Sequence, residues 1–290
     1  MRTIAIIGLG LIGGSIARQL HHIGNFSIAG YSHSRIDGQA ALDAGVIDYL
    51  ADSLSDAVRD ADLAVIAVSP EAIPVIAEQI GQLNAHILIT DTGSTKLPLV
   101  RAMDSMPQEL ASRFIPAHPV AGNQFSGFVG SDKNLFVDKT IVLTPAQANE
   151  EQGIKRVEGF WRLFTPKVVR IEAALHDVIF AYSSHLPHMV AWALTLAVSS
   201  NEKAALIFEY SAGGLKDFTR IAASDPELWA EIALSNRNNI IEAMDAFMGQ
   251  FQQLRSCIDK CDQTALLHFL EGGRTAHIGA QEAVAWRRSK

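Results

Sequence analysis

The first 171 residues alternate between short apolar runs and segments whose apolar side chains recur at helical spacing. Continuous apolar runs of this length are typical of strands buried in a parallel sheet. The strands are expected at residues 3–7, 26–31, 63–68, 86–90, 140–144 and 167–171. The helices between them are expected at residues 15–20, 37–44, 55–60, 70–83 and 149–164. Strands that alternate with helices in this way predict a doubly wound, parallel α/β sheet.

From residue 172 onward the apolar side chains recur at helical spacing throughout, and Pro and Gly become less frequent. Four helices are expected, at residues 173–200, 203–222, 227–255 and 263–287. Such a change of pattern indicates a domain boundary. We therefore expect an α/β domain over residues 1–171 and an all-helical domain over residues 172–290.

A glycine-rich turn follows the first predicted strand and leads directly into a helix. In the Gly-x-Gly-x-x-Gly spacing, Gly8 allows the tight turn, Gly10 lets the backbone approach a pyrophosphate, and Gly13 permits close helix–strand packing. The alternative is a glycine-rich turn that binds nothing, but the strand–turn–helix context favours a Rossmann-type dinucleotide site. The predicted cofactor contacts in this turn are Gly8, Gly10, Leu11, Ile12 and Gly13.

The end of the second predicted strand indicates which dinucleotide binds. A carboxylate here would grip the 2′-hydroxyl of NAD, but none occurs before Asp37. Hydroxyls and a cation suit a 2′-phosphate better, so we expect NADP, with NAD as the alternative if the loop returns Asp37 to the ribose. The predicted contacts are Ser32, His33, Ser34 and Arg35, together with Ser69 after the strand 63–68.

Two polar side chains that follow predicted strands are candidates for the chemistry. His118 stands beside Pro119 just after an apolar run, so its backbone is restricted and its imidazole is aimed by a stiff turn. Imidazole is well suited to proton transfer near neutral pH, although a histidine that only caps a loop is the alternative. Ser94 follows the strand 86–90, where it is either a substrate contact or a helix N-cap.

The helical half carries a second group of polar residues. His185 and His188 are neighbours on a helix, and Asp177 lies about three turns before His188 on the same face. Pro187 should interrupt this helix and free a carbonyl upstream. We expect no metal here, because the Glu of a His-Glu-x-x-His motif and a third ligand are both absent. His185 could equally be a core histidine.

Lys216 and Arg220 are four residues apart, so both cations share one helix face. Such a pair suits a dianionic small substrate, with the arginine binding a carboxylate through its two-pronged guanidinium. A solvated face or a pair of salt bridges is the alternative. Trp229, nine residues after Arg220, is expected either in the core or as a lid.

Composition narrows the possible partners and location. The chain has 48% hydrophobic and 19% charged residues and a net charge of −7, which argues against a nucleic-acid partner. No signal peptide and no apolar run of membrane-spanning length is found, so a cytoplasmic location is expected. The two cysteines, Cys257 and Cys261, are expected as small apolar residues on one helix face.

Five motifs, taken together and in this order, resemble those of the prephenate dehydrogenases and the related arogenate dehydrogenases of tyrosine synthesis. The glycine turn is shared with many Rossmann-type enzymes, whereas the last three motifs are specific to this family. The motifs lie at Gly8–Ser15, Asp91–Lys96, His118–Gly122, His176–Asp177 with Ser184–His188, and Lys216–Ala222.

The resemblance implies NAD(P)-dependent oxidative decarboxylation of prephenate to 4-hydroxyphenylpyruvate by a homodimer joined through the helical domain. It implies that His118 takes the proton of the ring hydroxyl, that Ser94 orients this hydroxyl, and that Asp177 orients His188. It implies substrate contacts by Arg220, Lys216, His188, Asp177, Gln124 and Trp229.

Some features leave alternatives open. Gln124 stands where many prephenate-preferring members carry Glu, so arogenate dehydrogenase and a dual cyclohexadienyl dehydrogenase remain alternative functions. A β-hydroxyacid dehydrogenase is disfavoured, because residues 173–200 contain no catalytic Lys. A non-catalytic, cofactor-sensing dimer is disfavoured because His118 and both cations are present. We expect no regulatory ACT domain after Arg287, so any inhibition by tyrosine would act at the active site.

Overall fold

The computed structural model describes residues 1–123 and 125–288. The contacts within the chain divide it into two compact units, Met1–Asn239 and Ile240–Lys290.

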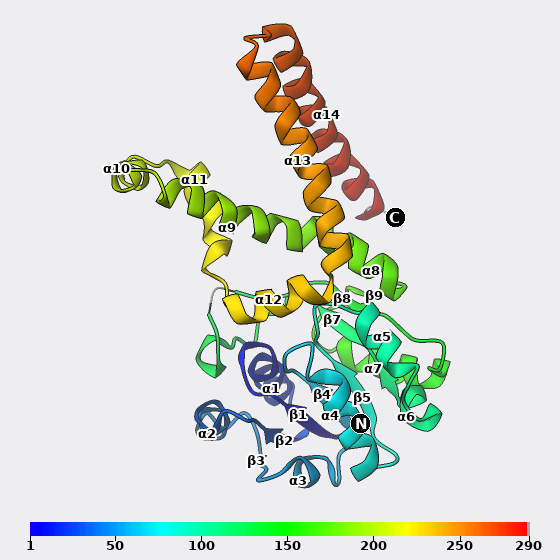
Figure 1. Ribbon diagram of the computed structural model, residues 1–290. Coiled ribbons are helices and arrows are strands. Elements are labelled where there is room, and N and C mark those ends of the chain that lie inside the picture. The colour runs from blue at the N-terminus through cyan, green and yellow to red at the C-terminus, as the bar shows by residue number, and fades with distance from the viewer. Residues whose placement is uncertain (124, 289–290) are drawn as a thin grey trace. The chain divides into compact units, whose positions relative to one another are not determined.

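The first unit is built on a six-stranded parallel sheet (Figure 1). The strand order, β3-β2-β1-β4-β5-β6, is that of dinucleotide-binding sheets, in which ligands sit beyond the carboxyl ends of the strands. The predicted doubly wound sheet is therefore confirmed. Its strands are β1 (Thr3–Ile7), β2 (Ser27–Tyr31), β3 (Tyr49–Leu50), β4 (Leu63–Ile66), β5 (Leu88–Asp91) and β6 (Phe114–Ile115).

Helices pack on both faces of this sheet. Successive side chains of a strand point to opposite faces, and β1 accordingly contributes Ile4 and Ile6 to one buried cluster and Ala5 and Ile7 to the other. The helices are α1 (Leu11–Ile23), α2 (Arg35–Asp43), α3 (Leu54–Val58), α4 (Ile73–Leu83), α5 (Leu97–Met103), α6 (Gln108–Arg113) and α7 (Glu151–Trp161).

The start of α4 differs from the sequence expectation. Pro70 was expected in the first helical turn, but Ser69 and Pro70 lie in a turn in which the Ser69 carbonyl accepts a hydrogen bond from the Ala72 N–H. The helix begins at Ile73, with Pro74 in its first turn. A proline is tolerated in the first turn of a helix, so the sequence alone did not show whether Pro70 or Pro74 occupies that turn.

Three short strands form a second sheet, and the expectation that two of them complete the first sheet is wrong. These strands are β7 (Ala117–Pro119), β8 (Ile141–Leu143) and β9 (Val168–Arg170), with β7 antiparallel and β9 parallel to β8. Pro116, which has no N–H to donate, separates β6 from β7 where the chain leaves the first sheet. His118 pairs with Val142 in this ladder, so a strand and not a free turn holds it.

The helical part of the first unit contains α8 (Ala173–Phe180), a π-helical turn (Ala181–His185), α9 (Leu186–Ser199), α10 (Ala204–Glu209), α11 (Gly213–Thr219), a 3-10 turn (Arg220–Ala223) and α12 (Pro226–Ser235). Two expected helices are each divided. The helix expected at 203–222 breaks before Gly213, and the one expected at 227–255 breaks at Asn236. The Asn236 side chain is buried and donates to the Asp177 carbonyl, which draws this residue out of the helix.

The second unit begins at Ile240, inside α13 (Arg237–Asp259), and also contains α14 (Gln263–Arg288). Large apolar side chains remain exposed on both helices, among them Phe251 and Leu270. Cys261 lies beyond the end of α13 with φ 51°, so the expectation that it shares a helix face with Cys257 is wrong. Among the described residues, no helix is long and apolar enough to cross a membrane.

Candidate active site

The glycine-rich turn has the geometry of a phosphate cradle. Gly8 has φ 95°, and a Cβ on Gly13 would lie only 1.9 Å from the Gly8 carbonyl oxygen. A Cβ on Gly10, in contrast, would meet no heavy atom of the described residues within 4 Å. Gly10 also precedes α1 without a capping side chain, so the first N–H groups of the helix stay open to an anion. The site therefore fits the pyrophosphate of a dinucleotide.

The end of β2 presents hydroxyls rather than a carboxylate. Ser34 caps α2, with its Oγ accepting from the Asp37 N–H at 3.2 Å. The Asp37 carboxylate accepts from the Phe128 N–H at 2.7 Å, which holds it on the 3-10 turn at 128–130. His33 and Arg35 are exposed, whereas Ser32 is half-buried.

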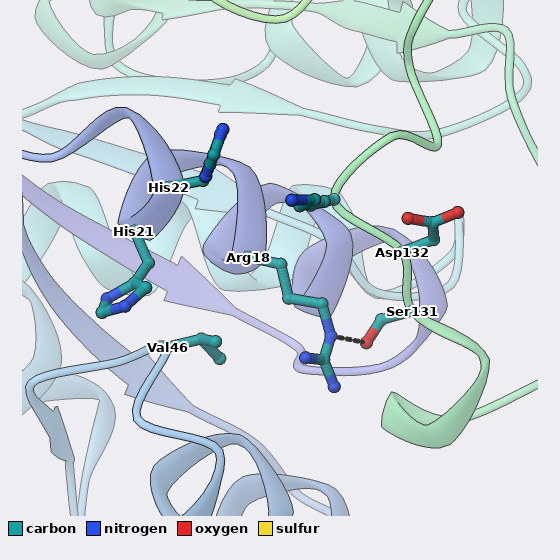
Figure 2. A pocket seen from close by; sticks show the side chains of 7 residues that line it. Arg18, His21, His22, Val46, Ser131 and Asp132 are labelled. Atoms are coloured by element: carbon teal, nitrogen blue, oxygen red, sulfur yellow. Dashed lines mark hydrogen bonds between the residues drawn. The ribbon is translucent and has the colours of Figure 1, made fainter.

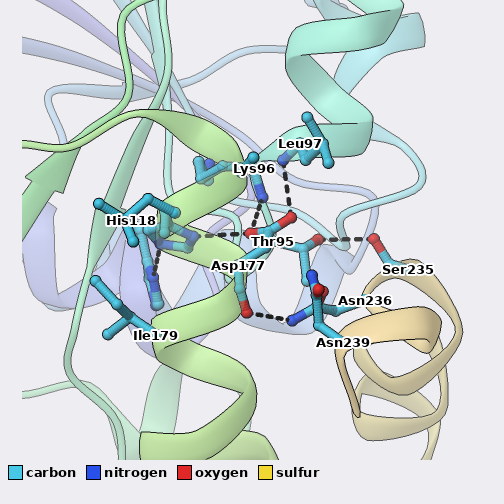
Figure 3. Close-up of polar contacts among 12 residues, drawn as sticks. Thr95, Lys96, Leu97, His118, Asp177, Ile179, Ser235, Asn236 and Asn239 are labelled. Carbon is cyan, nitrogen blue, oxygen red and sulfur yellow. Dashed lines mark hydrogen bonds and ion pairs between the residues drawn. The ribbon is translucent and has the colours of Figure 1, made fainter. Parts of the chain in front are cut away.

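His118 is the first member of a buried chain of hydrogen bonds (Figure 3). Its Nδ1 lies 2.9 Å from Nε2 of His176, and Nδ1 of His176 lies 2.8 Å from a carboxylate oxygen of Asp177. The Phe180 ring packs against both imidazoles, with centroids 4.7 and 4.4 Å away. The structure thus pairs Asp177 with His176, and not with His188 as the family resemblance implied.

Asp177 also caps a helix far from it in sequence. Its carboxylate accepts from the backbone N–H groups of Lys96 and Leu97, at 2.8 and 2.9 Å, where α5 begins. The N-cap position of α5 is Lys96, so Ser94 is not the cap. Ser94 lies two residues earlier, half-buried beyond the carboxyl end of β5.

A buried ion pair fixes the strand that carries His118. The Lys96 ammonium pairs with Asp91 and donates to the Ala117 carbonyl at 2.7 Å, and both charged side chains are fully buried. Asp91 in turn accepts from the Ala117 N–H at 3.0 Å. Burial lowers the pKa of Lys96, while the charge of Asp91 opposes this shift. The two residues clamp the backbone next to His118.

The imidazole of His118 is neutral at pH 7. Burial is the main reason that its pKa lies well below its usual range, and the neighbouring His176, Lys96 and His185 lower it further. A neutral imidazole is the form that can accept a proton.

His188 and Trp229 form a second cluster, with stacked rings whose centroids are 3.7 Å apart. His188 Nδ1 lies 2.9 Å from the carbonyl oxygen of Ser184, which belongs to the π-helical turn that ends two residues before Pro187. Burial lowers the pKa of His188, and the positive charge of Arg220 lowers it further. The charge of Arg220 therefore acts on the same cluster.

Arg220 and Lys216 are both exposed. Neither forms an ion pair with another residue of the described parts of the chain. Gln124 lies outside the described residues. In the described ranges, no group of three or more His, Cys, Asp or Glu could hold a metal ion.

Sequence reasoning did not assign roles to three residues of this site, namely His176, Asp91 and Lys96. His176 directly precedes Asp177 in a family motif, and this position was the available signal. Asp91 and Lys96 flank the turn that contains Ser94.

A surface pocket of about 320 Å³ lies elsewhere, along the C-terminal half of α1 (Figure 2). Its lining includes Arg18, His21 and His22. The Arg18 guanidinium donates to Ser131 Oγ at 2.7 Å and stacks on the Phe128 ring. These contacts within the chain account for the position of Arg18 without a ligand.

The fold and the site first define a class: an oxidoreductase with a dinucleotide-binding sheet and a buried histidine in the short strand that follows it. Two family models match in sequence, the nucleotide-binding domain of prephenate dehydrogenase at residues 16–170 and its dimerization domain at residues 172–272. The chain belongs to the prephenate dehydrogenase family. The family predicted from the motifs is therefore confirmed.

Individual relatives agree with this assignment. The cyclohexadienyl dehydrogenase of Zymomonas mobilis subsp. mobilis is 36% identical, over 93% of each chain. The prephenate dehydrogenase of Bacillus subtilis is 34% identical, over 96% of this chain and 76% of that protein. The crystal structure of prephenate dehydrogenase from Aquifex aeolicus with hydroxyphenyl propionate and NAD+ has a TM-score of 0.88 at 31% identity, covering 97% of this chain and 98% of that one.

Proposed function

We propose that the protein catalyses the NAD(P)-dependent oxidative decarboxylation of prephenate to 4-hydroxyphenylpyruvate. The ring hydroxyl loses its proton to a base as hydride leaves the carbon that bears it. CO2 then leaves from the opposite carbon as the ring becomes aromatic, and the resulting phenolate oxygen takes up a proton again. The single observation that carries the proposal is the buried imidazole of His118, which is held in β7 and whose pKa burial keeps well below its usual range. NAD(P)+ supplies the hydride acceptor when it is bound at the glycine turn.

In this proposal, other side chains orient and bind the substrate. His118 accepts the proton of the ring hydroxyl, and Ser94 orients that hydroxyl from the carboxyl end of β5. Arg220, supported by Lys216, binds a substrate carboxylate through charge-assisted hydrogen bonds. His188 and Trp229, which stack on one another, form an apolar wall with a polar edge. Gln124 remains a predicted substrate contact.

The preferred cofactor in this proposal is NADP. The Asp37 carboxylate is engaged by the Phe128 N–H, which supports the view that it does not grip a ribose hydroxyl. The exposed Arg35 follows Ser34 at the end of β2, where a 2′-phosphate needs cations and donors. NAD remains the alternative, because the Aquifex aeolicus relative was crystallised with NAD+.

A dual specificity for prephenate and arogenate is the second candidate function. The Zymomonas mobilis relative is named a cyclohexadienyl dehydrogenase, which supports it. The two substrates differ only in a side chain that carries a keto or an amino group, and Gln124 has no charge with which to distinguish them.

We also propose a domain boundary at residues 171 and 172, although the contacts within the chain divide it at 239 and 240. The two family models meet at residues 170 and 172, which supports the earlier boundary. The protein is proposed to be a cytoplasmic homodimer. A family dimerization domain and the exposed apolar side chains of α13 and α14 support the dimer, and two free cysteines suit a reducing compartment.

A side-by-side assay tests the function directly. Prephenate and arogenate are each mixed with NADP or NAD, and the absorbance of the reduced nicotinamide is followed, with the mixture lacking dinucleotide as the control. We expect turnover of prephenate, with tighter binding of NADP than of NAD. Tighter binding of NAD would overturn the cofactor preference, and no turnover of either substrate would overturn the function.

A further inference from the structure

The hydrogen bonds from His118 to Asp177 determine where the ring protons lie. The Asp177 carboxylate accepts hydrogen bonds from the Lys96 and Leu97 N–H groups, and Nδ1 of His176 lies 2.8 Å from one of its oxygens. The carboxylate oxygen that faces His176 is the same oxygen that accepts from the Lys96 N–H, so it acts as an acceptor toward Nδ1 of His176. Nδ1 of His176 therefore carries a proton and donates a hydrogen bond to Asp177.

The same reasoning extends one ring further. Burial lowers the pKa of His176, so its ring is neutral and has only one N–H. Because this N–H is at Nδ1, Nε2 of His176 is an acceptor, and Nδ1 of His118 must donate to it across 2.9 Å. The neutral His118 then has its only proton at Nδ1, and its Nε2 has a free lone pair. No residue in the described ranges hydrogen-bonds this Nε2.

We propose that His176 is a positioning residue that, together with Asp177, holds His118 in the tautomer whose Nε2 can accept a proton. This inference rests on the proposed function, in which His118 is the base. His176 also fixes the direction of the ring, since His118 Nδ1 is tied to it and Phe180 packs beside it. Asp177 couples this base to the turn at 91–96, because the same carboxylate caps α5.

Three substitutions of His176 separate this role from simple packing. Glutamine can place an amide oxygen near the position of Nε2 and so accept from His118. Asparagine keeps a donor for Asp177 but is too short to reach His118, and leucine fills the space without polar atoms. We expect His176→Gln to keep kcat within about tenfold of wild type, and His176→Asn and His176→Leu each to lose about 10²-fold with little change in KM.

A packing role would give a different order of activities. His176→Leu would then be as active as His176→Gln, and the loss of kcat would follow the loss of Tm across the three variants. Either result would overturn the proposal. Asp62→Asn is the matched control, because Asp62 also accepts two backbone N–H groups, from Arg2 and Thr3, at the opposite end of the sheet. It is expected to lower Tm and leave kcat unchanged.

A spectroscopic measurement tests the tautomer without turnover. Ring ¹⁵N chemical shifts of the histidine-labelled wild-type protein report which nitrogen carries the proton, with His118 assigned from its absence in His118→Asn. We expect the proton of His118 at Nδ1 in the wild type and in His176→Gln, and a mixture of tautomers in His176→Asn. A His118 proton at Nε2 in the wild type would overturn the proposed role of His176. If the proton is at Nδ1 but the protein turns over neither prephenate nor arogenate, only the proposed function is overturned.

Discussion

The buried histidines of this site are kept neutral by burial, and each is tied to a partner that sets its tautomer. His185 shows this most clearly. It is 1% exposed, and Nδ1 accepts from the Asn236 side chain at 3.1 Å. Burial is the main cause that lowers the pKa of His185 from 6.5 to about 4. Protonation of this ring would place a charge in the core and break the hydrogen bond from Asn236.

This shift predicts how stability depends on pH. Below pH 6.5 the unfolded chain protonates His185, whereas the folded protein does so only near pH 4, so acid favours the unfolded state across this window. We expect His185 to remove about 3 kcal/mol from the free energy of unfolding between pH 6.5 and 4. Asparagine can accept the same hydrogen bond without titrating.

Urea unfolding of wild type and His185→Asn at pH 7, 5 and 4 checks this expectation. The difference between the two proteins isolates His185 from the other histidines, because they are common to both. The variant should lose less stability in acid than the wild type. If the difference between them is the same at every pH, the assignment of this titration to His185 is contradicted.

At the scale of elements, two glycines of the glycine-rich turn differ in the space around their Cβ positions. Gly13 has no room for a Cβ because the Gly8 carbonyl oxygen is too close, whereas Gly10 faces open space. We expect Gly13→Ala to lower Tm by disrupting the packing of α1 on the turn. We expect Gly10→Ala to leave Tm unchanged and to raise the Kd for the dinucleotide at least about tenfold, because the methyl group blocks the pyrophosphate.

Calorimetric titration of NADP and thermal unfolding measure these two effects separately. Gly159→Ala is the control, since Gly159 lies inside α7 with open space around its Cβ position. This control should leave both cofactor binding and Tm close to wild type. Unchanged cofactor binding in Gly10→Ala would show that the dinucleotide does not pass over this turn.

The apolar pattern predicted most of the strands, although it missed the two-residue strand β3, and it did not predict which sheet each strand joins. Residues 141–143 and the valines at 168 and 169 form short apolar runs that would fit a strand in either sheet, so the local pattern does not indicate which sheet they join. Partner choice depends on long-range pairing, such as that of His118 with Val142. The break at Asn236 was missed because a hydrogen bond to Asp177, 59 positions away, decides it. The later start of α4 was missed because a local turn hydrogen bond decides it.

At the scale of the whole molecule, residues distant in sequence supply the parts of one site. The motifs predicted the family and drew attention to His118, Ser94, Asp177 and Arg220. They did not predict the contact between His118 and His176, because these residues are 58 positions apart and only the fold brings them together. The buried pair of Lys96 and Asp91 was missed for the same reason, since a sequence does not show that a charge is buried.

The central claim is that His118 is the base in the oxidation of prephenate. The most direct test is kcat for prephenate, from the absorbance of reduced nicotinamide, in the wild type and in His118→Asn. His86→Asn is the control, because His86 is exposed before the start of β5. We expect His118→Asn to lower kcat by about 10²- to 10⁴-fold with KM little changed, and His86→Asn to match the wild type. An unchanged kcat in His118→Asn would contradict the account.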